Sequence, residues 1–384
     1  MNIIILIFIT FPSMLLGSKI IELGYKWTKD GYLVITKVGD KKSHQFSISI
    51  STAYSFFTTL PGAVQLSDKN ETIHIDGKKK GVASSFVNDF SIIGREDNDA
   101  VIQNFIFYYV YPKQTILSDV LGFGFNGDHP SSLMRTMYNN KLIDDMKLVI
   151  TQVEKEYQGD IYIGGLPLKV NSKYPYSVRC SIPNDVTSTE WGCPLTAVWI
   201  NNNYHAYLHN KFVHFQADTY YNIAPLSFLD YMNKIFFNEE YKNGECHLDD
   251  FRSMKIIHCM CYATNNFPDI TLVINGYRVV YKKNLLFKAF IDECEFLFHG
   301  GDEATTDFIM VTTFMNNFAM MYDISDKSVT IMSKNEFISA VDIDVTEEWL
   351  KEKKYIMIVV SLLCVISICG LFVNIKRTLL FNNI

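Results

Sequence analysis

The stretch FSISISTAYSFF, residues 46–57, alternates apolar and polar residues and then enters a turn rich in Ser, Thr and Tyr. A similar stretch, VHFQADTYYNIAP, occupies residues 213–225, where Asp218 stands in the place of Ser51. Alternation with a period of two is typical of a β-strand with one buried face. Because both turns follow a strand and precede an apolar run that contains a proline, the pattern predicts a body with two duplicated halves.

Length and composition favour a large β-rich protein. The chain has 384 residues, which is enough for two lobes with a core each. It contains 28 Phe and 22 Tyr, and aromatic side chains suit the pleated, half-buried surface of a sheet. The formal net charge of -6 argues against a nucleic-acid partner, which requires a basic face.

Two apolar segments indicate targeting to a membrane system. Residues 1–17 contain a short apolar run, which is followed by the small residues Gly17 and Ser18, and this predicts a secretory signal peptide that is cleaved near Gly17. Because no basic residue precedes the run, an N-terminal anchor remains the alternative. Residues 355–373 carry no charge and are long enough to cross a bilayer, so we expect a transmembrane helix there. A polar stalk, residues 336–354, precedes this helix, and a tail, residues 374–384, follows it.

The orientation follows from the signal peptide, because basic residues flank both ends of the apolar span and do not decide it. A translocated amino terminus followed by one stop-transfer segment makes a single-pass type I membrane protein. We therefore expect the body in the secretory pathway or at the cell surface, with a cytoplasmic tail.

That compartment permits disulfides and glycosylation. Six cysteines can pair in 15 ways, so their spacing alone assigns no pairing. The CMC motif at residues 259–261 is also compatible with metal ligands, but without a second pair or a histidine cluster we expect disulfides. Asn70 begins the one glycosylation sequon. The cysteines of the body are Cys180, Cys193, Cys246, Cys259, Cys261 and Cys294.

Local patterns predict mostly strands. Hairpins are expected over residues 31–51, around Gly39-Asp40, and over residues 71–82. Asn275-Gly276, between alternating apolar residues, is a strong hairpin signal. Further strands are predicted in residues 104–112, 160–170 and 306–333, the last set with a polar turn at residues 325–328.

Two helices are expected among these strands. In the first, residues 131–143, Leu133, Met134 and Met137 share one face. The second begins near Pro225 and ends before residue 238. Its predicted buried face consists of Leu226, Leu229, Met232 and Phe236.

Five segments in this order resemble the pepsin-like aspartic proteases, and the likeness covers residues 31–333. The segment FPDITLVING, residues 267–276, is similar to that family's Leu-Pro-Asp-Ile-x-Phe-x-Ile-Asn-Gly and is the most specific match. The others are the opening hairpin at residues 31–52, DVLGFG at 119–124, GDIYIGG at 159–165 and FIMVTTFMNNFAMMYD at 308–323.

The resemblance implies a mainly β, bilobal pepsin-like fold, here followed by a C-terminal transmembrane helix. We expect an N-terminal lobe over residues 18–165 and a C-terminal lobe over residues 166–335. The family's cysteine pattern implies the disulfide Cys261–Cys294. Proximity then leaves Cys246–Cys259 and Cys180–Cys193 for the remaining four cysteines.

The resemblance also places two turns where the family has its catalytic acids. Aspartic protease chemistry uses two carboxylates that share one proton, each followed in the family by Thr and Gly. Here Ser51 occupies the first acid position and Asp218 the second. Thr52 and Thr219 retain the positions that lock the two turns together, whereas the glycine after Thr219 is replaced by Tyr220.

The family's flap, a hairpin over its cleft, also departs from the pattern. The best register places His74 at the flap tyrosine and Asp76 at the flap threonine, and it retains Gly77. In the closing strand, Val311-Thr312 stands where the family has Gly-Asp. A histidine titrates in a useful range, but in the charged tip DGKKKG we expect it to be solvated.

These residues predict a membrane-anchored pepsin-like homologue that does not catalyse proteolysis, because a serine hydroxyl cannot act as the ionised base of the dyad. We expect the cleft to bind an extended peptide or protein. An active aspartic-type endopeptidase that uses Asp218, and a purely structural surface protein, remain the alternatives. No cofactor, metal or nucleic acid is expected.

Overall fold

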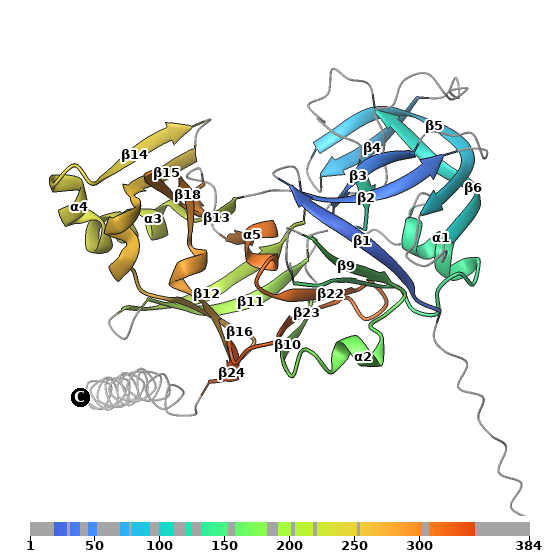
Figure 1. Cartoon of the computed structure of the whole chain (residues 1–384). Coiled ribbons are helices and arrows are strands. Elements are labelled where there is room, and N and C mark those ends of the chain that lie inside the picture. Colours follow the sequence, from blue (N-terminus) through green and yellow to red (C-terminus); the bar gives the residue numbers. More distant parts are fainter. Residues whose placement is uncertain are drawn as a thin grey trace, which may run out of the picture. The chain divides into compact units, whose positions relative to one another are not determined.

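The computed structural model describes fourteen stretches of the chain. They are residues 19–28, 31–38, 45–51, 70–76, 79–92, 100–110, 120–123, 132–152, 158–182, 191–200, 204–217, 221–251, 254–301 and 307–341 (Figure 1). Strands dominate these stretches and form two sheets of 12 strands each. The prediction of a mainly β protein is confirmed.

The first sheet has the strand order β10-β23-β22-β8-β9-β1-β2-β3-β7, and β5 lies beside β2, β4 and β6. It therefore combines the first strands of the body with strands from near its end, which Figure 1 shows as orange arrows beside green ones. Its strands are β1 (Ile21–Thr28), β2 (Gly31–Val38), β3 (Gln45–Ser51), β4 (Asn70–Asp76), β5 (Lys79–Ile92), β6 (Ala100–Val110), β7 (Val120–Gly122), β8 (Lys147–Ile150), β9 (Gln158–Ile163), β10 (Tyr176–Ser181), β22 (Ala319–Asp323) and β23 (Ser328–Ser333).

The second sheet has the strand order β18-β19-β15-β20-β13-β21-β12-β11-β16-β17-β24, and β14 pairs with β15. Its strands are β11 (Gly192–Ile200), β12 (Tyr204–Phe215), β13 (Asn222–Ala224), β14 (Cys246–Phe251), β15 (Met254–Met260), β16 (Ile270–Ile274), β17 (Tyr277–Tyr281), β18 (Phe287–Phe290), β19 (Glu293–Phe296), β20 (Phe298–Gly300), β21 (Phe308–Met310) and β24 (Ile338–Ala340).

The helices are short, and both predicted helices are present. Helix α1 (Leu133–Asn139) buries Leu133, Met134 and Met137, as expected, and Ser132 caps it by accepting a hydrogen bond from Arg135 N at 3.4 Å. Helix α3 (Leu226–Phe236) follows Pro225 and buries Phe228, Leu229 and Met232. The other helices are α2 (Leu168–Asn171), α4 (Asn238–Lys242), α5 (Thr312–Met315), and two 3₁₀ turns, η2 (Cys261–Asn266) and η3 (Lys283–Leu285).

Two local predictions are wrong. The strand predicted over residues 160–170 ends at Ile163, because Gly164 and Gly165 have φ of 102° and 134°, which a strand does not allow, and α2 follows. Within the predicted stalk, Ile338–Ala340 form β24 beside β17, because the side chain of Ile338 is buried in the core.

The predicted hairpin at Asn275-Gly276 is confirmed. Strands β16 and β17 pair directly from Ile274 with Tyr277 to Ile270 with Tyr281. Asn275 has φ of 48° and Gly276 has φ of 77°. Both central residues are therefore left-handed, as a two-residue turn of this kind requires and as Asn-Gly tolerates.

One buried apolar cluster contains residues of both sheets. Trp191, which precedes β11, packs edge-on against Tyr322 of β22 with ring centroids 5.2 Å apart. The disulfide between Cys180 of β10 and Cys193 of β11 also joins the two sheets. These contacts stabilise the two sheets against each other, and the aromatic contact is of the kind that a chain rich in Phe and Tyr can form.

The predicted targeting segments, residues 1–17 and 355–373, lie outside the described residues, as does the tail at residues 374–384. Among the helices that are described, none has the length and apolar character needed to cross a membrane. The chain up to Ser339 forms one compact unit, and a second unit begins at Ala340.

Candidate functional site

The strands that lead into the turns of Ser51 and Asp218 have similar neighbours in the two sheets. Strand β3 ends at Ser51 and pairs in parallel with β7, where Ser51 is opposite Gly122. Strand β12 ends at Phe215 and pairs in parallel with β21, where Phe215 is opposite Met310. Parallel neighbours are exceptional in these mostly antiparallel sheets, so the shared arrangement supports the predicted duplication.

The strand end that leads into the turn of Asp218 is anchored to the neighbouring strand. Gln216 N donates to Met310 O at 2.9 Å, and Ala217 is fully buried. Asp218, Thr219 and Tyr220 lie outside the described residues, as do Thr52 and Gly77. The structure thus describes the strands that lead into the two turns but not the geometry of their tips.

Asn222, the residue at which β13 leaves the second turn, is a polar anchor that the sequence reasoning missed. It is fully buried, and its Oδ1 accepts hydrogen bonds from Val311 N at 3.0 Å and from Thr313 Oγ1 at 3.3 Å. The second turn is thereby tied to the segment where the family's Gly-Asp is replaced by Val311-Thr312. A lone asparagine within the apolar run after Asp218 was the available signal.

A buried histidine–glutamate pair lies beside Tyr221, the first described residue after the same turn. His299 Nε2 and Glu295 Oε1 are 2.9 Å apart, and both side chains are at most 5% exposed. The ring of Tyr221 stacks on His299 with centroids 4.1 Å apart. Burial and the nearby charge of Glu295 raise the pKa of Tyr221. The pair therefore contacts Tyr221, which follows Asp218 by three residues in the chain.

Further titratable residues lie on the strands beside Glu295, and together with it they form a row across the second sheet. His247 of β14 is opposite His258 of β15, which is opposite Glu295 of β19. Asp249 Oδ2 lies 3.5 Å from His247 Nε2 and 3.8 Å from His258 Nε2. Exposure falls along the row from the half-exposed His247 to the buried Glu295. The part of the chain that the structure describes nevertheless contains no group of three such side chains placed to hold a metal ion.

Lys288 of β18 ends the row on its other side. It is opposite Glu295, and its ammonium lies over the Phe290 ring, 4.5 Å from the centroid. Burial lowers the pKa of Lys288, although the charge of Glu295 acts in the opposite direction. Glu295 is therefore placed between two basic side chains, of which His299 is the buried one.

The predicted flap hairpin is present in the backbone. Strands β4 and β5 pair in an antiparallel manner, with His74 opposite Lys80 and Asp76 opposite Lys79, and a register shift separates the two pairs. Among the described strands, β4 has only β5 as a partner. No described strand lies along the other backbone edge of β4.

All three predicted disulfides are confirmed: Cys180–Cys193, Cys246–Cys259 and Cys261–Cys294. The second bond joins directly opposite residues of β14 and β15. The third joins η2 to β19. The expectation of disulfides rather than metal ligands at the CMC motif is thus correct.

No family model matches the chain, and no curated protein sequence matches it. Solved structures do. Basic 7S globulin from soybean is similar with a TM-score of 0.65 and 11% identity, covering 85% of this chain and 99% of the globulin. The aspartic proteinase from Irpex lacteus is similar with a TM-score of 0.63 and 12% identity, covering 83% and 98% of the two chains. The chain therefore has the bilobal, mainly β pepsin-like fold.

Proposed function

We propose that this protein is a non-catalytic member of the pepsin-like group that binds an extended peptide or protein. The observation that carries the proposal is the serine at the end of β3. In the sequence alignment of the two turns Ser51 stands opposite Asp218, and the proposal is supported by the strands that lead into them, because β3 pairs in parallel with β7 as β12 does with β21.

The chemistry supports this reading. One carboxylate of an aspartic dyad must be ionised to activate water while the other is protonated to polarise the scissile carbonyl. Ser51 cannot supply the first function, because a hydroxyl does not ionise near neutral pH. Tyr220 stands where the family has glycine, and its larger side chain supports the proposal that the site does not hold the water that the dyad would activate.

Binding requires less of the site than catalysis does. An extended peptide adds to an open strand edge through main-chain hydrogen bonds, and pockets for alternate side chains then confer specificity. The edge of β4, which has no strand partner other than β5 in the described ranges, is the best candidate for such pairing. It belongs to the hairpin that the resemblance places over the cleft.

The first prediction concerns proteolysis. The full chain, purified in detergent, should not cleave denatured protein at any pH from strongly acidic to neutral, because loss of one acid–base group typically lowers the rate by about 10² to 10⁴. New peptide termini would be measured by mass spectrometry. Asp218→Asn should leave the result unchanged. Cleavage that Asp218→Asn abolishes and the exposed α3 control Asp230→Asn retains would establish the endopeptidase instead.

Binding is tested on the same material. A library of extended synthetic peptides, together with the aspartic-protease inhibitor pepstatin, should yield ligands that bind without being cleaved. Surface-bound peptides and competition with pepstatin would measure this. If neither peptide nor pepstatin binds, and no cleavage occurs, the proposal is wrong and a structural role is favoured.

We further propose that the body lies outside the cytosol as part of a type I membrane protein. The second prediction is that Asn70, the first residue of β4, carries a glycan in eukaryotic cells. Glycosidase treatment should increase gel mobility, and Asn70→Gln should abolish that shift. A tag after residue 384 should be digested by protease in intact microsomes. A protected tag, or an unglycosylated body, would contradict the proposed orientation.

A further inference from the structure

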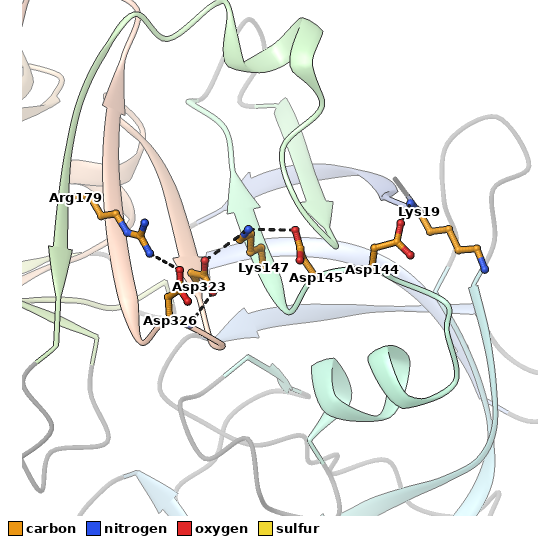
Figure 2. Close-up of polar contacts among 7 residues, drawn as sticks. All are labelled: Lys19, Asp144, Asp145, Lys147, Arg179, Asp323 and Asp326. Carbon is orange, nitrogen blue, oxygen red and sulfur yellow. Dashed lines mark hydrogen bonds and ion pairs between the residues drawn. The ribbon is translucent and has the colours of Figure 1, made fainter. Parts of the chain in front are cut away.

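The first described residue of the chain is fixed to the body through its backbone. Lys19 N donates a hydrogen bond of 2.7 Å to Asp144 Oδ2. The side chain of Lys19 extends away from that carboxylate, as Figure 2 shows, and its Nζ donates to Lys141 O at 3.0 Å. Asp144 therefore receives the main chain of Lys19 and not its ammonium group.

Asp144 differs in this respect from the other carboxylates of the same region. Lys147 Nζ lies 3.1 Å from Asp145 and 3.7 Å from Asp323. Arg179 pairs with Asp326 at 2.6 Å. In the described part of the chain, the one partner of Asp144 is the nitrogen of Lys19. The three other carboxylates drawn in Figure 2 have a cation, whereas Asp144 has a backbone nitrogen.

The chain is closely packed from Lys19 onward. A Cβ on Gly164 would lie 2.6 Å from Lys19 O, so this carbonyl contacts a position where only glycine fits. Ile20 is half-buried and packs beside Val149 and Tyr162, and Ile21, opposite Ile163, begins β1. Among the described residues, Lys19 is thus the first that makes these contacts with the body.

We propose that a signal peptidase cleaves the chain between Ser18 and Lys19 and that the new α-ammonium group of Lys19 pairs with Asp144. Water adds across the peptide bond, so that Ser18 leaves with a carboxylate and the nitrogen of Lys19 becomes an amine that takes a proton. Ser18 is a small residue of the kind that such cleavage requires. The inference rests on the proposed secretory leader and places its end two residues before β1.

Cleavage at this bond changes the chemistry of the contact without moving its atoms. An amide donates one hydrogen bond, whereas an ammonium group donates three and carries a charge, so its bond to a carboxylate is stronger. A free α-amino group titrates near pH 7.7–8.0, about two units below lysine. Pairing with Asp144 favours the charged form and raises that pKa in the folded protein. The stabilisation is then complete below about pH 7.7 and is lost as the pH rises through the higher folded value.

Charged groups beside this contact include the adjacent Asp145, Lys147, which pairs with Asp145, and the ammonium group of Lys19 itself, which donates to Lys141 O. Burial lowers the pKa of Lys147, but the hydrogen bond to Asp145 and the charge of Asp323 more than offset this and raise it above the ordinary lysine value. The part of the pH dependence between about pH 7.5 and pH 9.5 that Asp144→Asn removes therefore reports the α-amino group.

The third prediction is the position of the mature amino terminus. Full-length chain from eukaryotic secretory cells, solubilised in detergent, would be labelled at α-amines, digested and analysed by mass spectrometry. The expected first residue is Lys19. A terminus at Ser18, at Ile20 or beyond, or at Met1 would overturn the proposal. A terminus at Met1 on glycosylated protein would show a retained N-terminal anchor and leave the proposed location of the body intact.

The ion pair itself is tested by thermal unfolding of the same material from about pH 7 to about pH 9.5. For an exposed pair in a domain of this size, we expect the wild type to lose about 1–3 °C in Tm over this range, and Asp144→Asn to lose none of it. Asp145→Asn, the matched control on the adjacent residue, should retain the wild-type pH dependence. Equal pH dependence in wild type and Asp144→Asn would overturn the pairing.

Discussion

Replacement of His299 by leucine is expected to destabilise the protein by about 3–5 kcal/mol, because it leaves the Glu295 carboxylate buried without its partner. Leucine fills nearly the same volume, so the loss reflects the charge and not a cavity. Lys288 offers partial compensation only, since its ammonium is engaged over the Phe290 ring. The single change should lower Tm by on the order of 10 °C.

The double variant separates charge from packing. Glu295→Leu combined with His299→Leu removes both polar groups, and replacement of a whole buried pair by apolar residues is often neutral. Its Tm should lie closer to the wild type than that of His299→Leu. His247→Leu, on a half-exposed ring of the same row, is the control and should cost under about 1 kcal/mol. If the double variant is less stable than His299→Leu, the pair does not act as described.

Removal of the Cys261–Cys294 disulfide is the second large effect. Serine at both positions should destabilise the protein by about 4 kcal/mol, because the bond closes a loop with a sequence separation of 33 and restricts the unfolded chain. The Cys246–Cys259 bond, with a separation of 13, should contribute about 3 kcal/mol by the same reasoning. Thermal unfolding of the two double-serine variants would measure both values.

Both cysteines of a bond must be replaced together. Cys259 of β15 lies directly opposite Cys246 on one side and Cys294 on the other. A single Cys261→Ser change would therefore leave the Cys294 thiol beside the Cys246–Cys259 bond, where exchange is possible. Peptide mapping without reduction serves as the control for exchange. An unchanged Tm in the Cys261→Ser, Cys294→Ser variant would contradict the prediction.

Local features of the fold were predictable where a few neighbouring residues decide the conformation. The turn at Asn275-Gly276 requires two left-handed residues, which that dipeptide tolerates. Helix α3 follows from Pro225 at its start and from apolar residues at helical spacing. Helix α2 was missed because the two glycines before it lie in a segment whose apolar alternation continues past the strand end.

Of the candidate site, only the identity of the residues in the two turns was predictable from the amino-acid sequence. That Ser51 and Asp218 occupy the two turns is a fact of the amino-acid sequence, and their assignment to the two acid positions of the family is what the resemblance implies. The Glu295–His299 pair and the Asn222 anchor beside that turn were not predictable, because they depend on strand β20 lying parallel to β13. Nothing in the local pattern around residue 299 indicates which strand will be its neighbour.

The amino-acid sequence alone indicates most of the segments that form strands, and it decides which residues occupy the two turns and which cysteines are available. The tertiary structure decides which strands are neighbours and which cysteines pair. It places β22 beside β8, a pairing that the alternation of residues 319–323 does not indicate. It also decides which of the neighbouring cysteines on β14, β15 and β19 form disulfides. The physical reason is that a period of two specifies which face of a strand is buried, whereas the neighbour of a strand depends on packing and hydrogen bonding between segments far apart in the chain.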